Sequence, residues 1–110
     1  MAEAQRVGPF SRLYAPWVRA IAESGASGTQ VLVLVHLCQR LSFDADGNAT
    51  ASVPRREIAE ALSLSEETVR TATRRLVKSC LLSVAKPGHN GRATVYGVFP
   101  GIPWPERHSA

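Results

Sequence analysis

The stretch PRREIAEALSLSEETVRTATRRLVKSCLL, residues 54–82, decides the fold that we expect for this chain of 110 residues. Pro54 is suited to the start of a helix, and apolar residues follow it at helical spacing. Ser65 is a favourable N-cap for a second helix, whose first turn carries carboxylates that complement the positive helix end. The stretch therefore predicts two helices joined by a tight turn near Ser63. The apolar positions expected to pack are Ile58, Ala59 and Leu62 in the first helix, with Leu64 and Val69 as a hydrophobic staple at the start of the second.

Helical geometry, at about 100° per residue, divides the second helix into two faces. The face expected to pack consists of Val69, Ala72, Thr73 and Leu76. The opposite face consists of Glu67, Thr71, Arg74 and Lys78, with Thr68, Arg70 and Arg75 on its flanks. A helix about 10–12 Å across fits the major groove of B-DNA, in which arginine pairs with guanine edges and threonine contacts a base or a thymine methyl group. The exposed face is therefore a candidate base-reading surface.

A hairpin is expected after this helix. Two runs rich in β-forming residues, 81–85 and 93–99, surround the segment KPGHNGR, residues 86–92. A basic hairpin tip beside a basic helix can reach a minor groove or a phosphate strand, and the alternative is a solubilising surface hairpin. We expect His89 to contact phosphate or solvent rather than a metal ion.

The predicted DNA-binding residues form three groups. Base reading is assigned to Glu67, Thr68, Thr71, Arg74 and Arg75. Backbone contacts are assigned to Lys78, Lys86, His89 and Arg92. The remaining members are Arg55 and Arg56, on the exposed side of the first helix, and Arg70. The chain has no Ser/His/Asp or Cys/His constellation and no glycine-rich phosphate loop, so we expect no catalytic residues, no cofactor and no metal site.

Charge is distributed unevenly along the chain, whose formal net charge is +4. In residues 1–50 the charges cancel, whereas residues 51–110 carry nine Lys or Arg and five Glu. Within residues 66–92 there are six basic and two acidic residues. This asymmetry favours a polyanionic partner, with a solvated charged helix face as the alternative.

Two further helices are expected before residue 42. Residues 12–24 are amphipathic, with Pro16 in the first turn and an apolar stripe that we expect to cover the core, a dimer contact being the alternative use. Residues 26–41 form the core helix, because Ser27 and Gln30 fit a capping box before a long apolar run. The β-branched valines of that run also suit a strand, and length and the cap decide for a helix. The apolar stripe of the first helix is Leu13, Trp17, Ala20 and Ile21; that of the core helix is Val31, Leu34, Val35, Cys38 and Leu41, widened by Leu32, Val33 and Leu37.

Residues 42–48 have the composition of a turn and precede a short strand at 49–53. The spacing Asp44-x-Asp46-Gly47-Asn48 is faintly similar to a calcium loop, but it has no acidic residue at the bidentate position of an EF-hand, which favours a plain turn.

Cys38 and Cys80 fall inside apolar helical patterns without CxxC spacing, so we expect buried free thiols in a reducing compartment. The N-terminal residues lack the layout of a signal peptide, and the longest apolar run, Val31–Val35, is too short to span a bilayer. These features predict a cytoplasmic protein, associated with the nucleoid if it binds DNA, without a membrane partner.

The segment EIAEALSLSEETVRTATRRLVKSCLL and the glycine-rich hairpin after it resemble the winged helix-turn-helix domains of bacterial, plasmid and phage regulators. The fuller layout, with YAPWV, SGTQVLVLVHL and DADGNA, resembles domains of plasmid and phage replication proteins and small actinobacterial regulators. The resemblance spans residues 13–99 and implies an α+β fold with a three-helix core, a β-hairpin wing and an extra N-terminal helix. The chain departs from the pattern at Ser63 and Cys80, where glycine is usual, and at Arg55, where a capping serine is frequent.

The expected organisation is a flexible N-terminus at 1–10, a winged helix-turn-helix domain at 11–99 and a Pro-rich tail at 100–110. The expected function is sequence-specific binding of double-stranded DNA, as a homodimeric transcriptional regulator with recognition helix 66–79. One alternative is a plasmid or phage replication or partition accessory factor. Another is a winged-helix interaction module for protein or RNA. A protein partner would bind through the N-terminal helix or the tail, near Trp17 and Trp104.

Overall fold

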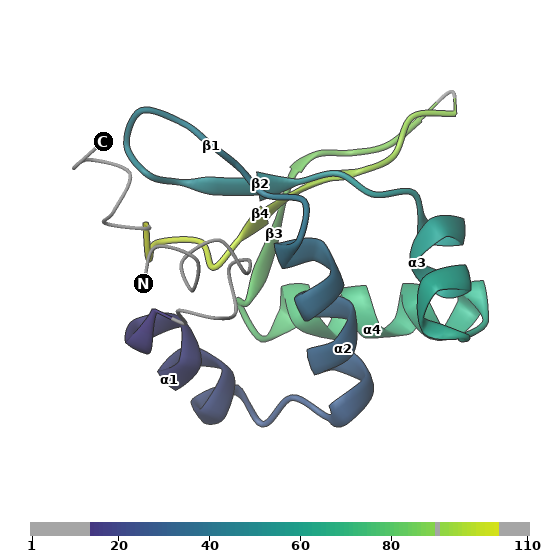
Figure 1. Ribbon diagram of the computed structural model, residues 1–110, viewed down its shortest axis with the longest axis horizontal. Helices are drawn as coiled ribbons and strands as arrows, with labels where there is room; N and C mark the ends of the chain where they lie inside the picture. The colour runs from purple at the N-terminus through teal and green to yellow at the C-terminus, as the bar shows by residue number, and fades with distance from the viewer. Residues whose placement is uncertain (1–13, 90, 104–110) are drawn as a thin grey trace, which may run out of the picture.

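Helices cover one side of a small antiparallel sheet in the computed structural model, which describes residues 14–89 and 91–103 (Figure 1). The helices of this part are α1 (Ala15–Ser24), α2 (Gly28–Cys38), α3 (Arg55–Leu62) and α4 (Glu66–Lys78). Its strands are β1 (Ser42–Phe43), β2 (Ala49–Ala51), β3 (Leu82–Lys86) and β4 (Val95–Val98). The α+β class predicted from the sequence is confirmed. The expected flexible N-terminus and Trp104 lie outside the described residues, and no described helix is long and apolar enough to cross a membrane.

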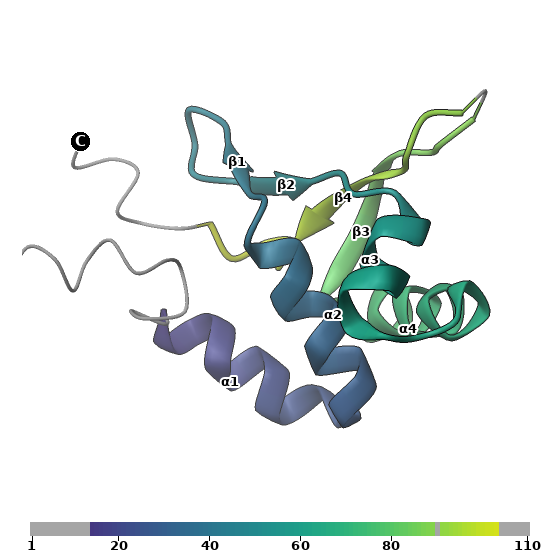
Figure 2. The ribbon, with the colours of Figure 1, turned by 45° about the vertical axis from the view of Figure 1, so that its right-hand side comes forward.

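The sheet has the order β1-β2-β4-β3, and all of its neighbouring strands are antiparallel. Strand β4 is therefore central, with Gly97 opposite both Thr50 and Ser83. The hairpin formed by β3 and β4 extends beyond the helices on the side of α3 and α4 (Figure 2). A register shift between Val84 and Lys86 marks a bulge in β3, a feature that bends a strand.

Strand β1 was not predicted, since residues 42–48 were expected to form only a turn. It exists because Ser42 and Phe43 pair with β2 across that turn. The Asp44 carboxylate accepts hydrogen bonds from the backbone N–H groups of Asp46 and Asn48, both at 2.9 Å. Hydrogen bonds from Asn48 and its neighbours lower the pKa of Asp44. The Asp44 carboxylate thus makes its hydrogen bonds to residues of its own turn.

Helices α3 and α4 end in the same way, each on a non-glycine residue in the left-handed region. Ser63 has a φ of 57° and Cys80 a φ of 65°. Each is followed by a leucine whose N–H donates back into the helix: Leu64 to the Ala59 carbonyl at 2.9 Å, and Leu81 to the Leu76 carbonyl at 3.0 Å. This is the Schellman pattern, in which the next apolar residue packs on the helix that has just ended. Burial of the leucines therefore holds two residues in a conformation that usually needs glycine.

The serine caps predicted for α2 and α4 are confirmed, although the Gln30 side chain makes no return hydrogen bond to Ser27, so the predicted capping box is only half formed. Ser27 Oγ accepts the N–H of Gln30 at 3.4 Å, and Ser65 Oγ accepts the N–H of Thr68 at 3.0 Å. Each serine satisfies one of the N–H groups that a helix start leaves without an intrahelical partner. These two caps fix where α2 and α4 begin.

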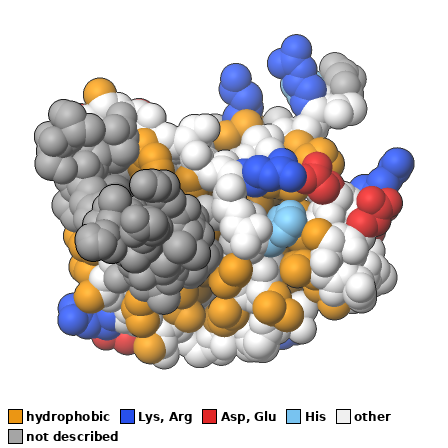
Figure 3. Space-filling view, in the orientation of Figure 1, with side chains coloured by type: hydrophobic (Ala, Val, Ile, Leu, Met, Phe, Trp, Pro, Cys, Tyr) orange, Lys and Arg blue, Asp and Glu red, His pale blue; other side chains and the backbone are white. Residues whose placement is uncertain are grey.

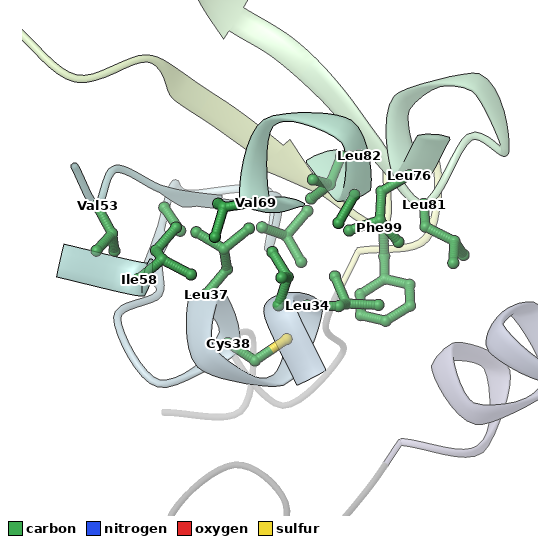
Figure 4. Packing of buried hydrophobic residues seen from close by; sticks show 14 of the residues in the cluster. Leu34, Leu37, Cys38, Val53, Ile58, Val69, Leu76, Leu81, Leu82 and Phe99 are labelled. Atoms are coloured by element: carbon green, nitrogen blue, oxygen red, sulfur yellow. The ribbon is translucent and has the colours of Figure 1, made fainter. Parts of the chain in front are cut away.

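Helix α2 packs against α4 and α3, and its Leu34, Leu37 and Cys38 side chains enter the buried cluster (Figure 4). The apolar stripe predicted for it was displaced: Val31 and Val35 are only half-buried, and Leu32 is 51% exposed. The residues of α2 that are buried are Gln30, Val33, Leu34, Leu37 and Cys38. The run is apolar at nearly every position, so packing against α4 and α3 selects the buried face.

Helix α1 docks through Trp17, which is 3% exposed. Its ring stacks on Phe99 with a centroid distance of 4.4 Å, and its Nε1–H donates to the Ile102 carbonyl at 2.8 Å. The prediction that the stripe of α1 covers the core is confirmed for Trp17, while Leu13 lies outside the described residues. Residues 99–102 are thereby joined to α1.

The two cysteines have different environments, and the prediction that both are buried is wrong for Cys80. Cys38 is 1% exposed within the core, whereas Cys80 is exposed. Cys80 follows the end of α4, where the left-handed backbone directs the chain, through Leu81, back into the core and leaves its own side chain outside.

We expect one of the two thiols to react rapidly with a thiol reagent at pH 8 in the folded protein. Burial raises the pKa of the Cys38 thiol to about 12, so almost none of the reactive thiolate forms there. Labelling followed by mass spectrometry should show Cys38 reacting at least about a hundredfold more slowly than Cys80. The Cys80→Ser variant should then stay unlabelled until it is unfolded. Equal rates at the two thiols would contradict this arrangement.

Candidate nucleic-acid interface

Helix α4 presents a polar face that is open to solvent. The four residues predicted to pack, Val69, Ala72, Thr73 and Leu76, are the buried residues of this helix. On the other side Thr71 is half-buried, and the exposed residues are Glu67, Thr68, Arg70, Arg74, Arg75 and Lys78. The Ser65 cap and the Leu76–Leu81 hydrogen bond fix both ends of this face.

A groove of about 340 Å³ runs along one flank of α4, between the helix and the hairpin strands; we call it the sheet-side groove. It brings Arg55, from the first turn of α3, together with Arg70 and Arg74 of α4. Its other lining residues are Thr73, Val77, Val84 and Tyr96. The structure therefore unites Arg74, which was assigned to base reading, with Arg55 and Arg70, which were not.

A second groove of about 290 Å³ runs along the opposite flank, between α4 and the first turn of α2; we call it the α2-side groove. Its α4 wall carries Thr71 and Arg75. The remaining lining residues are Ser27, Thr29, Gln30, Glu67, Thr68 and Ala72. The three from α2 were not predicted as site residues. The sequence feature that could have pointed to them was the Ser27 cap. A cap predicts where a helix starts, but it does not predict which other helix that start lies against.

A third cleft, of about 750 Å³, separates the first turn of α3 from the end of the β3–β4 hairpin. It contains the basic residues Arg55, Arg56, His89 and Arg92 beside the carboxylates of Glu57, Glu60 and Glu66. A Cβ on Gly88 would lie 2.5 Å from the backbone oxygen of Arg92, so this turn requires glycine.

Lys86 was predicted to lie in the turn, and this is corrected by the structure: it is the last residue of β3, opposite Val95. The bulge beside it lets the strand continue past the expected end. Lys86 lines the far side of the hairpin with His89 and Arg92.

One ion pair spans the exposed face of α4. The Arg70 guanidinium donates to the Glu67 carboxylate through three hydrogen bonds of 2.7 to 3.1 Å. Hydrogen bonding and the charge of Arg70, then the charges of Arg74 and Arg55, hold the pKa of Glu67 below its usual value. The same carboxylate raises the pKa of Arg70. Glu67 therefore remains ionised at neutral pH, beside three arginines.

The other Lys and Arg side chains of the predicted site form no ion pair with the described acidic residues. Arg40 pairs with Glu57, which offsets one carboxylate of the cleft at the hairpin. Within residues 14–89 and 91–103, no acidic partner is found for Arg55, Arg56, Arg74, Arg75, Lys78, Lys86 and Arg92. On the face seen in Figure 3, most Lys and Arg side chains lie toward the hairpin and α3, away from the apolar lower edge. This end of the molecule is thus suited to an anionic partner.

Among the described residues, no group of three or more His, Cys, Asp or Glu side chains is placed to hold a metal ion. Comparison of the chain with models of protein families, with curated proteins and with solved structures finds no match. The geometry of the exposed α4 face and its flanking grooves is therefore the basis for assigning a function.

Proposed function

We propose that this chain is a sequence-specific double-stranded DNA-binding protein with a winged helix-turn-helix arrangement. In this assignment α2, α3 and α4 are the three-helix core, α4 is the recognition helix, and the β3–β4 hairpin is the wing. The observation that carries it is the polar face of α4, which stands between two grooves and beside a projecting hairpin. Arginines other than Arg70 on α3, α4 and the hairpin have no acidic partner among the described residues. The sequence resemblance supports the same assignment.

The proposed mode of binding places α4 in the major groove, because a helix about 10–12 Å across matches a groove about 12 Å wide. Thr71 and Arg74 lie at the centre of the exposed face and are assigned to base edges, with Glu67 and Thr68 beside them. Arg75, on the flank of this face, is within reach of a base edge or a phosphate. Lys78, at the end of α4, contacts a phosphate. Arg55, Arg56, Lys86, His89 and Arg92 contact the backbone from α3 and the hairpin, and Arg70 from the flank of α4.

A transcriptional regulator is the role that we propose, acting as a homodimer on two half-sites about one helical turn apart. A footprint on DNA selected from around the gene would test this role. One protected palindrome is the expected result, whereas an array of direct repeats would favour a replication or partition factor.

Arg74→Ala should relax sequence preference, whereas Lys78→Ala should weaken binding to all duplexes about equally. Arginine pairing with a guanine edge discriminates between bases, and a lysine on a phosphate does not. Affinities would be measured by fluorescence anisotropy on a duplex selected by the wild-type chain from a random pool, and on its scrambled counterpart. We expect Arg74→Ala to reduce the ratio of the two affinities by about tenfold or more.

The matched control is Arg19→Ala, which removes the same charge from an exposed position on α1, outside both grooves. It should leave both affinities within about twofold of wild type. Wild-type affinities for both Arg74→Ala and Arg92→Ala would show that the helix and hairpin are not the DNA-binding surface.

A further inference from the structure

The first turn of α2 forms one wall of the α2-side groove, although α2 is otherwise the core helix. Ser27 Oγ accepts the N–H of Gln30, and no hydrogen-bond acceptor for the N–H groups of Gly28 and Thr29 is found among residues 14–89 and 91–103. Free N–H groups and the helix dipole make a helix start electropositive. This wall therefore offers backbone donors and partial positive charge to the groove.

A second observation comes from the Gln30 side chain, which lines the same groove. Gln30 is only 9% exposed, and its amide makes no hydrogen bond within the described part of the chain and keeps contact with solvent. Buried amide groups are normally paired, because burial without a partner loses the hydrogen bonds that water would make. A mostly buried side chain whose free amide lines a groove is suited to a ligand with hydrogen-bonding atoms.

The opposite wall selects an anion. Arg75 brings a positive charge and Thr71 a hydroxyl group. Glu67 also lines the groove, but its carboxylate bonds to Arg70, which lies on the other flank of α4. Its negative charge is thereby compensated by Arg70.

We propose that the α2-side groove binds a backbone phosphate of the DNA, with donors from the first turn of α2, Gln30 and Arg75. This site rests on the proposed function, because it requires α4 to lie in the major groove. The two strands that border a major groove then pass on opposite flanks of the inserted helix. One strand meets Arg55 and Arg70 at the sheet-side groove, and the other meets the first turn of α2.

The test is Thr29→Glu, which puts a carboxylate at the start of α2. An acidic residue in the first turn favours a helix, so loss of binding cannot be attributed to weakened folding. Each phosphate contact contributes a salt-dependence slope of about 0.9, which corresponds to about tenfold in affinity at 0.1 M salt. We expect Thr29→Glu to lose about tenfold or more on both selected and scrambled duplexes.

The matched control is Gln39→Glu, the same change of charge at the exposed other end of α2, about 15 Å away. It should change affinity by less than about twofold. Equal binding by the two variants, while Arg74→Ala still relaxes sequence preference, would overturn the phosphate site and leave the proposed function standing. Failure of the wild-type chain to bind any duplex would overturn both.

Methylphosphonate substitution, which neutralises one phosphate at a time, locates the contact. The wild type should lose about tenfold at one position, and Thr29→Glu should lose little or nothing at that position. If the losses caused by methylphosphonate and by Thr29→Glu simply add at every position of the duplex, the assignment would be overturned. Binding of millimolar inorganic phosphate to this groove without displacement of DNA at constant ionic strength would show a site for free anions and would also overturn it.

Discussion

Raising the salt concentration from 50 to 200 mM should weaken binding of this chain to duplex DNA by about a thousandfold or more. Each phosphate neutralised by Lys or Arg releases counterions, and six or more such contacts give losses of about 10³ to 10⁵ over this range. The residues assigned to the backbone that have no acidic partner in the described part are Arg55, Arg56, Lys78, Lys86 and Arg92, and Arg75 joins them at the α2-side groove. Anisotropy titrations at four or five salt concentrations would measure the slope.

The salt-dependence slope of each single variant shows how much the substituted residue contributes to it. Lys78→Ala and Arg92→Ala should each reduce it by about 0.9, whereas Arg19→Ala should leave it unchanged. A contact with a protein partner that is mostly apolar would depend little on salt. A wild-type slope shallower than about 2 would therefore contradict the backbone contacts and favour the interaction-module alternative.

The two faces of α4 could be predicted from the sequence because the decisive interactions are local. Ser65 sets the start of the helix, and the 3.6-residue period then fixes which side chains share a face. The same applies to the ends of α3 and α4. Leu64 and Leu81 follow residues that had been identified as departures from glycine, and their burial explains why Ser63 and Cys80 are tolerated.

The face of α2 could not be predicted in the same way. In the run VLVLVHLC nearly every position is apolar, so periodicity cannot separate Leu32, which is 51% exposed, from Val33, which is fully buried. Strand β1 has only two residues, too few to show an apolar/polar alternation. The α2-side groove depends on partners distant in the sequence. No local pattern indicates that Thr29 and Gln30 lie opposite Thr71 and Arg75.

Leu76→Ala should lower the free energy of unfolding by about 2–5 kcal/mol, since it removes buried methyl groups and leaves a cavity. Leu76 is 0% exposed, on the face of α4 that packs against α2 and β3. Domains of this size are stable by about 5–15 kcal/mol, so the loss would remove much of the total. Urea titration followed by circular dichroism would measure it.

The matched control is Leu32→Ala, the same deletion on a helix at a position that is 51% exposed. Because both substitutions replace leucine by alanine within a helix, helix propensity contributes about equally, and the difference between the variants isolates burial. Leu32→Ala should cost less than about 1 kcal/mol. If Leu32→Ala lowers the free energy of unfolding as much as the 2–5 kcal/mol expected for Leu76→Ala, Leu32 is also buried in solution. Helix α2 would then contact a partner chain through Leu32, which the sequence prediction had placed in the core.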